Sequence, residues 1–165
     1  MAKKKKFKIK GMKKLMRNFN TEVQGIQGRS LAGMINAVII VQRDSYEGVP
    51  IDLSNLAHSW FSVTYKTKGN VTPDLGSFKG EEASAMRSEH QNVIQALEQF
   101  ASRVGSASAP VMIYGYTANY AAWVHENNAD AKFKRPKAHA RWFYLSIQRK
   151  RSEMLEAIRQ SARIQ

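Results

Sequence analysis

The feature that most constrains the fold is an apolar stripe with helical spacing near the start of the chain. Between residues 12 and about 46, apolar side chains recur at steps of three, four and their multiples, at Met12, Met16, Phe19, Val23, Ile26, Met34, Val38 and Val41. This spacing places them on one face of an α-helix. The Gly48-Val49-Pro50 step predicts the end of the helix, because a proline disfavours helical backbone in the preceding residue.

Three glycines interrupt this stripe. Gly25, Gly28 and Gly33 each weaken a helix by roughly 1 kcal/mol relative to alanine. We therefore expect the helix to bend or break between Gly25 and Gly33, with its most buried half from Leu31 to Val41.

Two later segments have the character of β-strands. After a polar turn at residues 51–56, residues 57–68 alternate and are rich in aromatic and β-branched side chains, a pattern typical of a strand. Residues 69–80 contain Gly, Asn, Pro and Asp and predict a loop. Residues 111–116 predict a second strand, short and apolar enough to be central.

Further helices are predicted between and after the strands. Residues 81–104 form one, with Ala85 or Met86, Val93, Leu97, Phe100 and Val104 on its apolar side. Residues 119–126 predict a helical turn. Pro136 suits the first turn of a last helix, because its missing N–H is no loss there. The apolar side of that helix comprises Phe143, Ile147, Met154, Leu155, Ile158 and Ala162.

These elements predict an α+β fold. A small antiparallel sheet is packed by a long N-terminal helix and a C-terminal helix, with an additional helix inserted between the strands. At 165 residues the chain is long enough for one domain with a real core. We assign residues 12–165 to a single α+β domain and residues 1–11 to a basic N-terminal arm.

The net charge of +13 is concentrated at the two ends of the chain. Residues 1–17 carry nine Lys or Arg and no acid, and residues 132–163 carry ten basic and two acidic residues. The segment between them has a net charge of −4. Basic ends around a mildly acidic centre indicate contact with a polyanion or an acidic protein surface. For residues 1–10 alone, a solubilising or disordered tail is an equally good interpretation.

A search for catalytic or metal sites finds little. The four histidines lack the spacing of a zinc site on a helix, and there is no cysteine, phosphate-binding loop or nucleophile elbow. His125, Glu126 and Asp130 are the one local acid–base grouping, which we interpret as the polar rim of a turn. We expect no enzymatic activity, cofactor or metal, and keep a small hydrolase using His125 and Glu126 as a distant alternative.

Membrane and secretory segments are not expected either. There is no run of about 18 uncharged apolar residues, as a membrane helix requires. The basic N-terminus leads into Phe7-Lys8-Ile9-Lys10 rather than a long apolar segment with a cleavage site. Together with the lack of cysteine, this fits a protein made in a reducing cytoplasm.

Basic and aromatic residues alternate at both ends, a pattern that occurs in nucleic-acid-binding proteins. Lysine and arginine neutralise phosphates, and aromatic side chains stack on unpaired bases. However, Trp142, Phe143 and Tyr144 are consecutive on a predicted helix, so at least one of them must face the core, and the same holds for Tyr120 and Trp123, three apart on a predicted turn. For all of these aromatic residues we favour a position in the core. Non-specific phosphate contact by the basic ends stays open.

Two segments resemble the tail-completion or head–tail joining (neck) proteins of long-tailed bacteriophages. Residues 49–60, Val-Pro-Ile-Asp-Leu-Ser-Asn-Leu-Ala-His-Ser-Trp, are similar to that family's Pro-x-Asp-Thr-Gly-x-Leu-x-x-Ser segment. Residues 118–126, Ala-Asn-Tyr-Ala-Ala-Trp-Val-His-Glu, resemble its Tyr-Ala turn, which an Arg-Pro step and a last helix follow, here Arg135-Pro136. The order of elements agrees over roughly residues 12–163.

The chain departs from the family pattern in three places. Leu53-Ser54 stands where the family has Thr-Gly, so a turn that should tolerate positive φ lacks its glycine. The helix at 81–104 is longer than the family's usual connection, and the lysine-rich N-terminus is additional.

The resemblance implies a virion protein of the phage neck or tail, made in the host cytoplasm. It would be one subunit of a homo-oligomeric ring, with the connector, tail terminator or tube as neighbours and genomic DNA passing through the lumen. The basic ends would border that DNA or dock as arms on acidic neighbours, through Lys3, Lys4, Lys5, Lys6, Lys8, Lys10, Lys132, Lys134, Arg135 and Lys137. Assembly contacts are expected at Tyr120, Trp123 and His125. The alternative is a free-standing, non-specific nucleic-acid-binding protein with basic ends.

Overall fold

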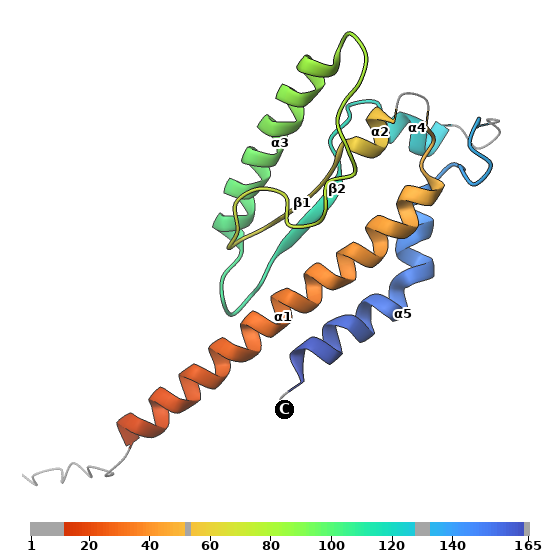
Figure 1. Ribbon diagram of the computed structural model, residues 1–165. Helices are drawn as coiled ribbons and strands as arrows, with labels where there is room; N and C mark the ends of the chain where they lie inside the picture. Colours follow the sequence, from red (N-terminus) through yellow and green to blue (C-terminus); the bar gives the residue numbers. More distant parts are fainter. Residues whose placement is uncertain (1–11, 52–53, 128–132, 164–165) are drawn as a thin grey trace, which may run out of the picture.

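The computed structural model describes residues 12–51, 54–127 and 133–163. Its elements are α1 (Met12–Gly48), α2 (Asn55–His58), β1 (Trp60–Thr64), α3 (Ala83–Val104), β2 (Met112–Tyr116), α4 (Ala121–Asn127) and α5 (Trp142–Ala162). The long helices α1 and α5 lie side by side, and α3 lies beyond the sheet, away from them (Figure 1). The predicted α+β fold, with long terminal helices and an inserted helix, is confirmed. The predicted arm, residues 1–11, lies outside the described residues.

Helix α1 continues through all three glycines for 37 residues (Figure 1). The predicted bend or break between Gly25 and Gly33 is therefore wrong. A Cβ atom at Gly33 would lie 2.8 Å from the Ile158 Cα of α5, so the absent side chain allows the two helices to approach closely. Packing against α5 offsets the intrinsic cost of glycine at this position.

The two halves of α1 differ in environment. Leu31, Ala37, Val38 and Val41 are buried, as predicted for the half from Leu31 to Val41. Met16, however, is 59% exposed, so the apolar stripe does not stay buried to the start of the helix. Figure 1 shows the reason: the N-terminal half of α1 projects beyond the end of α5 and beyond the sheet.

The two strands pair antiparallel, from Trp60 opposite Tyr116 to Thr64 opposite Met112. All five residues of β1 are buried, although its alternating pattern predicts one exposed face. The polar residues are buried because the following loop covers them: Ser62 Oγ lies 2.7 Å from Asn70 Oδ1 and 2.7 Å from Thr72 Oγ1.

The predicted boundaries of the strands also change. Residues 55–58 form the short helix α2, where the turn and the start of the first strand were predicted. Strand β2 pairs with β1 alone among the described strands and is mostly half-buried, so its predicted central position is wrong.

The apolar side predicted for α3 is confirmed in part. Met86, Val93 and Leu97 are half-buried, but Phe100 and Val104 are 46% and 49% exposed. Ala101 is buried, and a Cβ atom at Gly105 would lie 2.4 Å from the Tyr65 Cβ. The end of α3 therefore packs closely through small residues, with Gly105 against Tyr65 just after β1, and leaves Phe100 and Val104 exposed.

The C-terminal region has one shifted boundary. Helix α4 confirms the predicted helical turn, whereas α5 begins at Trp142 and Pro136 precedes it in a turn. That turn is attached to the end of α1 by a hydrogen bond from the His139 N–H to the Gly48 carbonyl, 3.1 Å long. The last helix therefore starts later than the proline predicts.

The aromatic residues divide between core and surface. Trp142 is buried, Phe143 is half-buried against Trp60, and Tyr120 is half-buried. Trp123 and Tyr144 are 61% and 50% exposed, so the predicted core position is wrong for these two.

Candidate functional site

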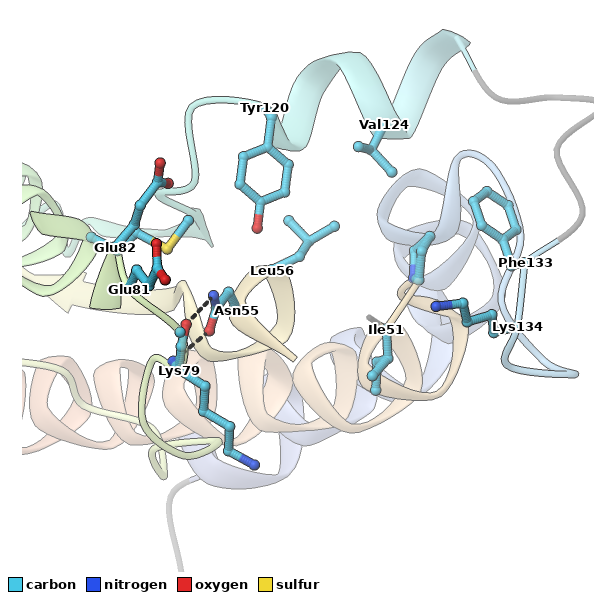
Figure 2. Close-up of a pocket in the computed structure, with 13 residues that line it drawn as sticks. Ile51, Asn55, Leu56, Lys79, Glu81, Glu82, Tyr120, Val124, Phe133 and Lys134 are labelled. Carbon is cyan, nitrogen blue, oxygen red and sulfur yellow. Dashed lines mark hydrogen bonds between the residues drawn. The ribbon is translucent and has the colours of Figure 1, made fainter. Parts of the chain in front are cut away.

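A cavity of about 870 Å³ lies at the end of the molecule where α1 terminates (Figure 2). Segments far apart in the sequence build it: the exit of α1, α2, the approach to α3, α4 and the segment before α5. Its lining comprises Pro50, Ile51, Asn55, Leu56, Lys79, Gly80, Glu81, Glu82, Met86, Tyr120, Val124, Phe133 and Lys134.

Two hydrogen bonds fix one side of this cavity. Asn55 Nδ2 donates to the Lys79 carbonyl and Asn55 Oδ1 accepts from the Lys79 N–H, both at 2.8 Å. This pair joins α2 to the segment that leads into α3. Beside it, Leu56 is buried in a cluster with Val49 and Trp142. The cavity wall is therefore held by the core.

The wall is apolar in the middle and charged at its ends. In Figure 2 the ring of Tyr120 and the side chain of Val124 point toward Leu56, with Phe133 at one end. Partial burial raises the pKa of Tyr120. Glu81 and Glu82 are exposed at the opposite end from Lys134 (Figure 2).

The three predicted assembly residues have different environments. Tyr120 lines the cavity, whereas Trp123 points into solvent. His125 instead connects α4 to α5. Its ring lies edge-on to Trp142 at 4.9 Å, Nδ1 donates to Glu126 at 2.5 Å, and Nε2 accepts from the Tyr144 N–H at 3.3 Å. These contacts give His125 a structural role in the described fold.

The predicted basic loop is partly attached to α1. Arg135 stacks on the Tyr46 ring at 5.0 Å and donates to the Tyr46 carbonyl. Lys137 Nζ lies 2.8 Å from Glu47 Oε2, and this hydrogen bond lowers the pKa of Glu47. Lys134 lines the cavity. Outside the described residues lie Lys132 and the arm residues Lys3, Lys4, Lys5, Lys6, Lys8 and Lys10.

One group of candidate residues was missed by the sequence reasoning: the apolar wall, Ile51, Leu56, Val124 and Phe133, which no local pattern brings together. A second group, Lys13, Lys14 and Arg17, was counted in the basic segment 1–17 but not named as contact residues, and the structure exposes all three on the projecting half of α1.

Within the described ranges, no three or more His, Asp or Glu side chains are placed to hold a metal ion. No helix in these ranges has the length and apolar character needed to cross a membrane.

Comparisons with protein families, with curated proteins and with solved structures found no match for this chain.

Proposed function

We propose that this chain is a non-enzymatic structural protein of a phage neck or tail. It acts as one subunit of a ring that completes the tail or joins it to the DNA-filled head. The resemblance at residues 49–60 and 118–126 motivates this proposal. The observation that carries it is the projecting half of α1, in which the described side chains from Lys13 to Gln24 are exposed.

A projecting helix is costly for a free monomer. Most helical stability in proteins comes from packing of an apolar face, and isolated helices shorter than about 12–15 residues are marginal in water. The described side chains between Lys13 and Gln24 are exposed, Met16 among them. A neighbouring subunit that covers this segment would supply the missing packing.

A second surface supports assembly. Trp123 is 61% exposed on α4, and tryptophan is enriched among the residues that contribute most to protein interfaces. Lys13, Lys14 and Arg17 on α1 are also exposed. In a ring these cations would face either the DNA in the lumen or an acidic surface of a neck or tail neighbour.

The proposal is tested by electron microscopy and sedimentation of the purified full-length protein. Closed rings with one copy number are expected. In the phage itself, loss of the gene should leave filled heads apart from tails, or tails with malformed ends. Normal infectious particles without the gene would contradict the proposal.

The alternative, a free-standing nucleic-acid-binding protein, rests on the exposed cations of α1 and the basic arm. It predicts tight binding of duplex DNA by the monomer, with affinity falling steeply as salt rises. Such binding without ring formation would favour the alternative. A ring subunit should hold free DNA weakly.

A further inference from the structure

We propose that residues 3–10 of one copy dock in the cavity of the next copy. Phe7 and Ile9 would lie against its apolar wall, and the lysines would lie beside Glu81 and Glu82. This inference rests on the proposed function and names the contact that links successive subunits.

The cavity offers both kinds of contact that such a segment needs. Its wall presents Ile51, Leu56, Tyr120, Val124 and Phe133 around one hollow (Figure 2). The exposed carboxylates of Glu81 and Glu82 lie at one end. An occupant should therefore be short, with apolar side chains beside a cluster of positive charge.

The N-terminal arm has this chemistry. Residues 3–10 read Lys-Lys-Lys-Lys-Phe-Lys-Ile-Lys and contain six lysines and no acid. In an extended backbone, successive side chains point to opposite sides, so Phe7 and Ile9 share one side and Lys6, Lys8 and Lys10 the other. Glu81 and Glu82 outnumber Lys79 at one end of the cavity and Lys134 lies at the other, so the cluster Lys3–Lys6 belongs at the end with the two carboxylates.

The arm cannot reach the cavity of its own chain. The 37 residues of α1 span about 55 Å at 1.5 Å per residue, and the cavity begins at Pro50, just past the end of α1. Phe7 precedes Met12 by five residues, which bridge at most about 18 Å. Even if the arm folded straight back along α1, Phe7 would remain roughly 35 Å short of Gly48.

The cavity that Phe7 fills must therefore belong to another copy. A contact in which the arm of one copy enters the cavity of the next is head-to-tail. Head-to-tail contacts close into rings when the rotation between subunits permits it. The projecting half of α1 would then be the spacer that carries the arm to its neighbour.

Two full-length variants test this contact. In the cavity variant, Glu81→Lys with Glu82→Lys, both substituted residues are exposed, so the fold should be retained. In the arm variant, Phe7→Asp with Ile9→Asp, the cavity stays intact. Each variant alone should sediment as a monomer. An equal mixture should form a one-to-one dimer and grow no further, because one intact arm then meets one intact cavity.

The matched control is Glu153→Lys with Glu156→Lys, the same charge change on α5. It should assemble like the unmodified protein. If either test variant still forms rings, or if their mixture stays monomeric, the inference is overturned.

A second measurement separates this inference from the ring itself. A fluorescein-labelled peptide of residues 1–11 should bind the full-length arm variant, and Glu81→Lys with Glu82→Lys added to that protein should weaken binding at least tenfold. If the peptide binds but the unmodified protein forms no rings, the arm–cavity contact is supported and the proposed ring is contradicted. If rings form but the peptide does not bind, the ring is supported and the arm–cavity contact is contradicted.

Discussion

At the scale of single residues, Gly33 is a position where α5 passes too close to α1 to leave room for a side chain. A Cβ atom there would lie 2.8 Å from Ile158 Cα and 3.0 Å from Ser161 Cβ, both in α5. Gly33→Ala should therefore lower the free energy of unfolding by about 1–3 kcal/mol through overpacking. Gly28 is the matched control, since a Cβ atom there meets nothing within 4 Å.

Gly28→Ala should raise the free energy of unfolding by up to about 1 kcal/mol, through helix propensity alone. Urea unfolding followed by circular dichroism measures both changes. The same sign for the two substitutions would contradict the close approach of α5 at Gly33.

Asp44 connects α1 to α5 and should make stability depend on pH. Arg149 Nη2 lies 2.8 Å from Asp44 Oδ2. Burial alone would raise the pKa of Asp44, but hydrogen bonds from Arg149 and Ser146 and the charge of Arg149 outweigh it and lower the pKa. The contribution to stability is therefore present above the ordinary pKa of 3.8 and is lost as pH falls through the lower folded value.

Asp44→Asn should accordingly lower the free energy of unfolding by about 0.5–1 kcal/mol at pH 7. At pH 2 the difference from the unmodified protein should shrink toward zero. Urea unfolding at the two pH values measures this. Glu153→Gln, which breaks the exposed pair with Lys150, serves as the control. An equal effect of Asp44→Asn at both pH values would contradict a stabilising role for the ionised Asp44 carboxylate.

At the scale of elements, α1 should behave as two segments. Residues 31–45 pack against the sheet and α5, whereas the described side chains of residues 13–24 are exposed. The backbone hydrogen bonds of an exposed helix without tertiary packing open at a low free-energy cost. In a monomer, hydrogen exchange should therefore be fast at 13–24 and slow at 34–45.

Assembly should slow exchange at 13–24 and leave 34–45 almost unchanged. Mass spectrometry of the monomeric variants and of the assembled protein measures this difference. Residues 13–24 that stay unprotected in the assembled protein would show that the projecting segment is not an interface.

At the scale of the whole molecule, exposed aromatic residues on two different faces allow a controlled test of assembly. If α4 contributes to the ring, Trp123→Ala should weaken association by more than about 1 kcal/mol, the usual threshold for an important interface residue. Phe100→Ala on α3 removes a comparably exposed ring, 46% exposed against 61% for Trp123, and should leave assembly unchanged. The protein concentration at which half of the chains are assembled, determined by sedimentation, measures the effect of each substitution. An equal effect of the two substitutions would contradict a specific interface at α4.

The order of the main elements could be predicted from the sequence, because helix and strand periodicity are local. The stripe at Val38 and Val41, the strand signal around Val63 and the helical spacing of Phe143 and Ile147 needed no knowledge of their partners. One local detail was also informative: Ser54, where the resemblance expects glycine, has a φ of 67°.

The tertiary structure alone decided which faces these elements bury. Helix α1 continues through Gly33, where α5 passes close by, and Ser62 of the fully buried strand β1 is covered by the 69–80 loop. Trp123 is exposed because Val124 of α4 and Tyr120, just before α4, pack inward instead. The cavity joins Ile51 to Phe133, which are far apart in the sequence. Periodicity records the repeat of one element, whereas burial depends on what packs against it, and that contact exists only once the chain has folded.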